Sequence, residues 1–361
     1  MSTDLKLSAP RRSIGPARMQ GLSLVELMIA MTLGMATVAA VGWIYLGTTQ
    51  TYRSQDALAR LQEGARYAFE IMSNDLRMTG TTGCSYTKSV NVINNYDTRW
   101  YTNPLEQPVT SAEKNGSAGT VTELSDALRV LRADISREYV VQNHNSGTAQ
   151  FTLTAAHDLA NGALLMATDC DLVSVFQASG ATSPNVNHAA SGSPGNSTAN
   201  LGTGGAAYTF AANSRIYRLS ANNYYVANNP AGEPALFRLR PIGANATPTA
   251  EELVEGVEDM QISYGVDTDA TPDGEPNFVD PDGDGDPYLK GDQVNTGAVP
   301  GANAQERWAR VVSMRISVLM RTAENNVVPS AQRYTYNGAA VTAGDRRLRK
   351  VFTHVIKMRN R

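Results

Sequence analysis

The 361-residue sequence has little of what most enzymes and nucleic-acid-binding proteins require. It contains two cysteines and four histidines, and its formal net charge is −3. Beyond the first residues there is no basic run of the kind that binds nucleic acid. The sequence has no phosphate-binding loop, no Gly-x-Ser-x-Gly and no His-Glu-x-x-His motif. We therefore predict a protein that is not an enzyme and does not bind nucleic acid.

The histidines are scattered, and none forms a recognised ligand or base arrangement. They are His144, His157, His188 and His354. Because a lone histidine is more often exposed or satisfied by its neighbours than catalytic, we expect structural roles for all of them.

Long apolar runs are absent except for one near the N-terminus. Residues 22–46 are predominantly apolar, and Glu26 is their only charged residue. As a helix this run measures about 37 Å, enough to cross a bilayer core of about 30 Å. The cations that precede it are Lys6, Arg11, Arg12 and Arg18. Because the Lys- and Arg-rich flank of a membrane span stays in the cytoplasm, we expect the N-terminus there and the rest of the chain across the membrane.

A small residue, Gly21, stands immediately before the apolar run, whereas a secretory signal carries its small residues after it. Cleavage after Gly21 would remove the basic leader and retain the apolar helix. Glu26 would then be fifth in a mature chain that begins at Leu22. A carboxylate in a membrane span is unfavourable and usually functional. The alternative is a plain membrane anchor with an incidental acid.

The segment Gly-Leu-Ser-Leu-Val-Glu-Leu at residues 21–27 resembles the prepilin leader of type IV pilins and type II secretion pseudopilins. It departs from the family at Leu22, where Phe is most frequent. The resemblance implies that prepilin peptidase cuts after Gly21 and methylates the Leu22 amine. It also implies that Glu26 pairs with the N-terminal amine of a neighbouring pilin inside a fibre.

The helix is predicted to continue beyond the membrane to residue 78. Apolar residues recur at three- and four-residue steps and form a stripe that would lie on a sheet. This stripe contains Leu58, Leu61, Ala65, Ala68, Met72 and Leu76. The charged residues expected on its other faces are Arg60, Glu63, Arg66, Glu70 and Asp75.

From residue 125 onward the pattern favours strands. The predicted strands cover residues 127–132, 139–142, 150–154, 163–168, 172–177, 215–219, 224–227, 236–240, 260–266, 308–321, 333–336 and 351–358. Residues 251–257 are predicted as a short helix or strand. Residues 178–207 are rich in Gly, Ser, Asn, Ala and Thr, which is typical of a mobile loop.

These elements predict an α+β fold of the type IV pilin kind, with a long helix on an antiparallel sheet domain that carries large loops. The expected parts are a cleaved leader at 1–21, an N-terminal helix at 22–78 with its transmembrane part at 22–46, and a periplasmic β-rich domain at 79–361.

Further segments narrow the resemblance to the PilW branch of minor pilins, which is similar to the J-type pseudopilins. They are residues 62–69, 75–80, 83–84, 169–170 and 350–361. The resemblance implies an inner-membrane protein that primes type IV pilus assembly, lies at the pilus tip and serves twitching motility. The implied partners are other minor pilins, the major pilin, prepilin peptidase, the assembly platform and a large tip protein. The alternatives are a type II secretion minor pseudopilin and a membrane-anchored periplasmic adhesin or binding module.

Both cysteines, Cys84 and Cys170, follow the membrane segment and would reach the oxidising periplasm. This location favours a disulfide between them. Two free buried thiols are the alternative.

One acidic stretch resembles the start of an EF-hand calcium loop. It carries Asp280, Asp282, Asp284 and Asp286 at alternate positions and glycine at the sixth, but Gly291 stands at the twelfth instead of Glu. The sequence leaves open a calcium site or a solvated acidic turn. Three upstream acids would join only through tertiary folding: Asp267, Asp269 and Asp273. Related pseudopilins bind calcium in their globular domains, and no cofactor is required.

Overall fold

The computed structural model describes residues 23–112, 117–118, 121–122, 125–242, 246–281, 283 and 285–358. The chain divides into two units, Met1–Arg53 and Ser54–Arg361, and helix α1 (Leu24–Arg77) contributes to both. Ser23 stands at the start of α1, and its hydroxyl accepts the Val25 N–H at 3.2 Å. Such a cap satisfies a backbone donor that has no partner within the first turn. The predicted leader, 1–21, lies outside the described residues.

In the first unit, α1 presents apolar side chains to its surroundings. Val38 is 73% exposed and Trp43 is 85% exposed. The threonine hydroxyls turn back onto the helix instead: Thr32 donates to the Ile29 carbonyl at 2.9 Å, and other threonines do the same. These bonds satisfy polar groups that have no partner in an apolar medium. The surface of this segment is therefore suited to lipid or to other apolar helices.

In the second unit, α1 buries one stripe of its surface, and this confirms the predicted periodicity. The buried apolar residues are Leu61, Ala65, Ala68, Met72 and Leu76, while Leu58 is half-buried. Burial of each Leu or Met contributes about 1.5–3 kcal/mol. The stripe fixes this part of the helix on the sheets.

The first sheet has the strand order β1-β8-β7-β11-β5-β6-β10-β9, with β12 on β11, β13 on β12 and β2 on β5. Strands β1 and β8 are parallel, and the other described pairs are antiparallel. The bounds are β1 (Lys88–Asn91), β2 (Val109–Ala112), β5 (Ala127–Asn145), β6 (Gln150–Leu153), β7 (Leu164–Thr168), β8 (Leu172–Gln177), β9 (Gly180–Thr182), β10 (Asn185–Asn187), β11 (Arg215–Asn228), β12 (Pro234–Ile242) and β13 (Thr247–Glu255).

The second sheet has the antiparallel order β14-β15-β18, and a hairpin of β16 and β17 follows β15 in the chain. These strands are β14 (Val257–Val266), β15 (Val311–Arg321), β16 (Arg333–Tyr336), β17 (Ala339–Thr342) and β18 (Arg349–Lys357). The shorter elements are η1 (Tyr96–Thr98), β3 (Ser117–Ala118), β4 (Val121–Thr122), η2 (Thr203–Gly205), α2 (Gly291–Val294) and α3 (Ala304–Trp308).

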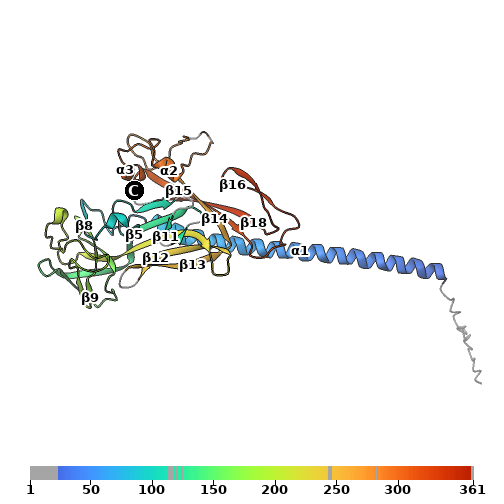
Figure 1. Ribbon diagram of the computed structural model, residues 1–361, viewed down its shortest axis with the longest axis horizontal. Coiled ribbons are helices and arrows are strands. Elements are labelled where there is room, and N and C mark those ends of the chain that lie inside the picture. Colours follow the sequence, from blue (N-terminus) through green and yellow to red (C-terminus); the bar gives the residue numbers. More distant parts are fainter. Residues whose placement is uncertain are drawn as a thin grey trace, which may run out of the picture. The chain divides into compact units, whose positions relative to one another are not determined.

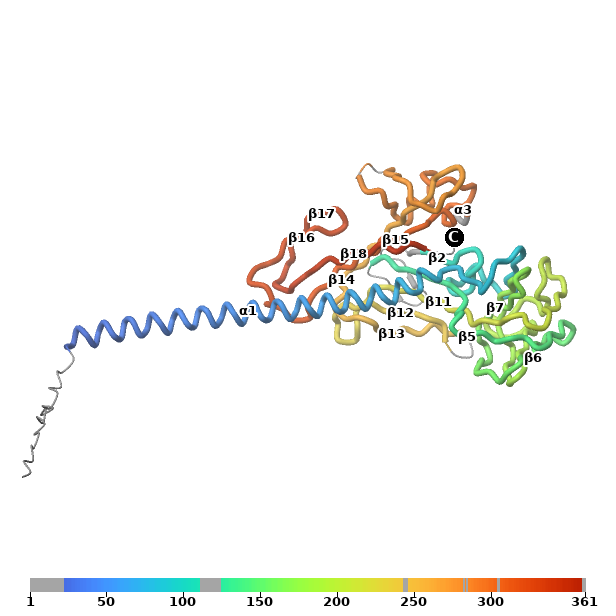
Figure 2. The backbone as a smooth tube through the Cα atoms, turned by 180° about the vertical axis from the view of Figure 1, so that it is seen from behind, coloured from blue at the N-terminus to red at the C-terminus, as the bar shows by residue number. Residues whose placement is uncertain are grey.

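One core joins the second half of α1 to both sheets. Met72 of α1, Tyr224 of β11, Tyr264 of β14 and Ile316 of β15 are all fully buried within it. Figures 1 and 2 show this half of α1 running beside β11, β12 and β14. The protein is thus α+β, with a long N-terminal helix packed on a mostly antiparallel β domain.

A second core fills a distal lobe, which we define as β6, β9, β10 and the end of β5 with the chain around them. Its centre is the buried aromatic group Phe151, Phe176 and Phe210. Strands β9 and β10 fall within residues 178–207 and belong to this lobe, so the prediction of a loop throughout this segment is wrong.

In residues 178–207, a side-chain amide forms hydrogen bonds with backbone groups that would otherwise pair with another strand. The Gln177 N–H donates to Asn196 Oδ1 at 2.7 Å, and Asn196 Nδ2 donates to the Gln177 carbonyl at 2.8 Å. Both residues are buried. The amino-acid composition of this segment favours a loop. It cannot reveal these amide contacts, because they join residues that are not neighbours in the sequence.

Three strand predictions also change. The predicted strands 127–132 and 139–142 are one strand, β5, because β11 pairs with both parts. Strand β15 begins at Val311, since Trp308 belongs to α3 and packs edge-on against Tyr264 at 4.9 Å. Residues 251–257, predicted as helix or strand, fall mostly in β13.

Candidate functional site

The apolar part of α1 is the first candidate site. Among the described residues, α1 is the one helix long and apolar enough to cross a membrane, and none of its apolar window is buried. Glu26 lies in the first turn and is exposed. Its carboxylate accepts the Ser23 N–H at 3.4 Å. Gly21 and Leu22, the predicted processing site, lie outside the described residues.

The C-terminal end of α1 is held by a buried carboxylate, Asp75, which is 5% exposed. Its Oδ1 accepts Arg132 Nε at 3.1 Å and Nη2 at 2.9 Å. Its Oδ2 accepts Asn222 Nδ2 and the Tyr224 hydroxyl, each at 2.6 Å. Burial, and then the charge of Asp75, raises the pKa of Tyr224. The arrangement joins α1 to β5 and β11.

Asp75 was expected on a face of the helix other than the apolar stripe, and its burial there was not predicted. Asp75 lies beside the apolar stripe, and its partners are 57 and more residues away in the chain. Periodicity along one helix contains no signal for such partners.

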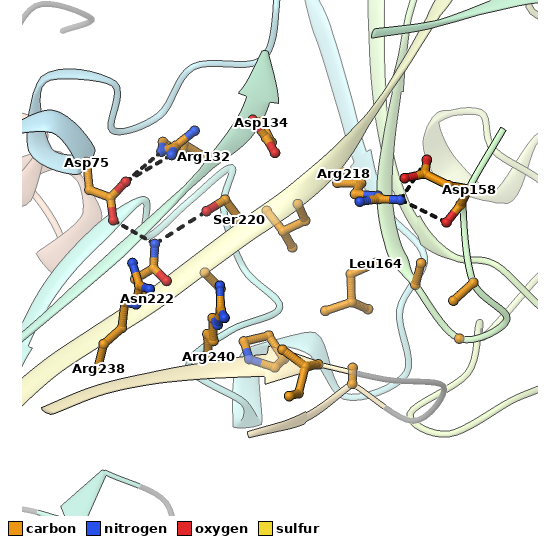
Figure 3. A pocket seen from close by; sticks show the side chains of 18 of the residues that line it. Asp75, Arg132, Asp134, Asp158, Leu164, Arg218, Ser220, Asn222, Arg238 and Arg240 are labelled. Carbon is orange, nitrogen blue, oxygen red and sulfur yellow. Dashed lines mark hydrogen bonds and ion pairs between the residues drawn. The ribbon is translucent and has the colours of Figure 1, made fainter. Parts of the chain in front are cut away.

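A groove of about 670 Å³ lies beside the last two turns of α1 and is lined mainly by residues of the first sheet (Figure 3). Arg132, Arg218, Arg238 and Arg240 line it. Arg218 pairs with Asp158 at 2.9 Å on one side. On the other, Arg238 pairs with Glu251 at 2.8 Å, and Arg240 lies 3.7 Å from the same carboxylate. These ion pairs make the lining of the groove polar.

The two cysteines form a disulfide, Cys84–Cys170, which fits the expected pairing. It connects the loop after α1 with the turn between β7 and β8. The closed loop is long, since 86 positions separate the two residues. Such a cross-link restricts the unfolded chain and stabilises the domain by about 2–4 kcal/mol.

The acids of the predicted calcium loop have other partners. Asp280 accepts the N–H groups of Gly283 and Gly285 at 2.8 and 3.0 Å. Asp286 pairs with both terminal nitrogens of Arg315. Asp282 and Asp284 lie outside the described residues.

Folding brings a different acidic group together, Asp267, Asp269 and Asp273. One carboxylate oxygen of each lies within 4.8 Å of the others. Backbone N–H groups, the Gly274 N–H first, lower the pKa of Asp267. Oxygen ligands of this kind fit calcium. Calcium binding therefore stays a prediction, and this group offers one candidate donor set.

The histidines have structural surroundings in the fold. His144 and His188 form a buried pair in the distal lobe. His157 Nδ1 accepts the Leu159 N–H at 3.2 Å, and His354 packs on Phe69 with ring centroids 5.4 Å apart.

The fold and these sites define an α+β protein with a long N-terminal helix compatible with a single-pass membrane anchor. Residues 223–360 match the family described as "Type IV Pilus-assembly protein W". The matched region runs from β11 to the end of β18. No curated protein and no solved structure matched the chain. This match covers less than half of the 361 residues, and it supports a PilW-type protein involved in type IV pilus assembly.

Proposed function

We propose that this chain is a minor pilin that primes the growth of the type IV pilus and lies at its tip. The family match carries the proposal, because it covers most of the strands that pack on α1. The exposed apolar half of α1 supports it, since such a helix can leave lipid for a bundle of similar helices without exposing polar groups.

In this proposal prepilin peptidase removes the leader after Gly21 and methylates the amine of Leu22. The protein then resides in the inner membrane, with its N-terminus inside and its β domain in the periplasm. The cations of the leader and the Cys84–Cys170 disulfide support this orientation. From the membrane the subunit enters the fibre.

Assembly depends on one charge in the apolar helix. Glu26 pairs with the terminal amine of a neighbouring pilin, and each charge compensates the other inside an apolar bundle. The β domain, fixed to α1 through Asp75, presents surfaces to other minor pilins, to the major pilin and to a large tip protein. The assembly platform of the inner membrane adds the subunits. The function is assembly, without turnover of a substrate.

The test is the amount of major pilin sheared from cells that lack this gene and cannot retract their pili. We expect a large loss, restored by the wild-type gene and poorly restored by Gly21→Ala or Glu26→Ala. Glu63→Ala is the matched control, because Glu63 is an exposed acid of the same helix outside the apolar run.

Unchanged surface pili in the deletion strain would contradict the proposal. Protein secretion would then be measured, because a minor pseudopilin of type II secretion shares the leader and the helix. Full rescue by Glu26→Ala would instead indicate an anchored binding module that never enters a fibre.

A further inference from the structure

The outward face of the second sheet forms the floor of a cleft. The proposed function in pilus assembly assigns no role to this cleft. Gln261 of β14, Ser317 of β15 and Thr353 of β18 lie on this floor, on the face opposite α1. The β16–β17 hairpin and residues 285–290 line its sides. Figure 1 shows the hairpin and the region of α2 on the same side of β15 and β18. The cleft volume is about 990 Å³, within the range of about 300–1,000 Å³ for ligand sites.

The hairpin side of the cleft is attached to the floor. Asn337 Nδ2 donates to Gln261 Oε1 at 3.3 Å. The Tyr336 hydroxyl donates to the Ser317 carbonyl oxygen at 3.4 Å, and Tyr336 is 9% exposed. These contacts hold the tip of the hairpin over the sheet.

The opposite side is held by an arginine from the floor. Arg315 binds the Asp286 carboxylate through both terminal nitrogens, with Nη1 2.9 Å from Oδ1. Its guanidinium carbon lies 4.6 Å from the ring centroid of Tyr288. Since both sides are fixed, a ligand would bind without the entropic cost of ordering them.

The charges around the cleft nearly cancel. Asp126, Asp259 and Asp286 face Arg315 and Lys290. Arg315 neutralises Asp286, and Asp126 is buried and accepts the Ile262 N–H at 3.0 Å. A slight excess of acid disfavours polyanionic ligands. A polar floor equally disfavours apolar ligands, because its groups would lose water without gaining partners.

Most other lining groups both donate and accept hydrogen bonds. Gln261 and Asn337 contribute amides that bond to each other, Ser317 and Thr353 contribute hydroxyls that lie 3.0 Å apart, and Thr335 contributes a third hydroxyl. Sugar hydroxyls have the same dual character, so each can donate to or accept from such a surface. Tyrosine combines an apolar ring with a polar tip, and Tyr288 and Tyr336 line the cleft. We propose that this cleft binds a neutral oligosaccharide.

The experiment measures binding of the full-length protein, in detergent micelles, to immobilised neutral hexasaccharides of glucose, galactose, mannose and N-acetylglucosamine. A heparin hexasaccharide serves as the polyanion. We expect at least one neutral hexasaccharide to bind with a Kd below about 1 mM, and heparin to bind more weakly.

The variant Gln261→Ala/Asn337→Ala removes two amides from the cleft and should weaken binding about tenfold. The matched control Asn74→Ala/Gln107→Ala removes an asparagine and a glutamine from exposed positions outside the cleft. It should bind like the wild type. Thr353→Trp fills an exposed position on the floor and should abolish binding.

Three results would overturn the proposal: no neutral hexasaccharide bound at 1 mM, a preference for heparin, or equal binding by the cleft variant and its control. Thermal unfolding of each variant establishes that it is folded before binding is compared. If the cleft variant unfolds, Thr353→Trp alone decides the outcome.

Discussion

His144 and His188 lie with their Nε2 atoms 2.9 Å apart in the core of the distal lobe. His144 Nδ1 accepts the Phe210 N–H at 3.0 Å, so the proton of a neutral His144 is on Nε2 and is donated to His188. The ring of His144 stacks on Phe151 with centroids 4.0 Å apart. The pair is therefore a neutral hydrogen bond inside an aromatic cage.

The histidine pair makes the distal lobe sensitive to acid. Burial lowers the pKa of His144 and of His188 to about 4, and for His144 the neighbouring His188 adds to the effect. As pH falls from about 6.5 towards 4, the unfolded chain takes up protons that the folded lobe does not. The free energy of unfolding should therefore decrease over this window, by up to about 3 kcal/mol per histidine.

Urea unfolding of the full-length protein between pH 7.5 and 4 checks this. His144→Phe/His188→Phe should remove most of the pH dependence, whereas His354→Gln, outside the lobe, should retain it. A wild-type protein whose stability is constant from pH 6.5 to 4.5 would contradict the prediction.

Asp75 should be the most sensitive polar residue at the junction of α1 and the first sheet. Asp75→Ala leaves Arg132, whose side chain is 11% exposed, without its buried counter-charge. We expect a loss of about 3–5 kcal/mol in the free energy of unfolding. Glu70→Ala, at an exposed position one turn earlier on α1, should change it by less than about 0.5 kcal/mol.

The double variant Asp75→Leu/Arg132→Met tests the cause. Because replacement of both charges by apolar groups removes the unpaired charge, it should recover part of the loss. If Asp75→Ala unfolds at the same urea concentration as Glu70→Ala, the ion pair has no structural role.

Removal of the disulfide should lower stability without changing the fold. Cys84→Ser/Cys170→Ser opens a loop with a sequence separation of 86 and so increases the conformational entropy of the unfolded state. The expected loss is about 2–4 kcal/mol, measured as a lower Tm and urea midpoint. Wild-type protein reduced with dithiothreitol should match the variant, and an unchanged midpoint in both would show that the cross-link contributes nothing.

Calcium should raise the Tm if the acidic loops hold the ion. If the group around Asp267 binds the ion, Asp269→Asn/Asp273→Asn should remove the increase in Tm, while Asp280→Asn should retain it. Loss of the effect in Asp280→Asn alone would favour the EF-hand-like stretch instead. Equal Tm values in calcium and in EDTA would exclude calcium at both places.

The extent to which the sequence predicts this protein depends on the range of the interactions. The α1 stripe at Leu61, Ala65 and Met72 was predictable because helical periodicity is local and one face must be buried. Strands such as β16 and β8 were predictable for the same reason, since alternation and turn residues mark them within a few positions. The PilW resemblance also came from linear motifs.

The candidate sites divide in the same way. The predicted processing site at Gly21 and the charge at Glu26 are linear features that a single segment displays. The Asp75 network, the His144–His188 pair and the acidic group around Asp267 each unite residues from distant segments. No local pattern predicts such pairs, because their energy comes from burial and charge compensation that exist only after the chain has folded.

The sequence by itself determined the apolar N-terminal segment, the amphipathic helix that follows it and the strand-rich remainder, because hydrophobic periodicity acts over a few residues. The tertiary structure decided which polar residues are buried and which segments become ordered. Residues 178–207 show the difference: their composition favours a loop, yet amide and histidine contacts from other strands give them a core. Those contacts satisfy polar groups only where the folded sheets bring them together.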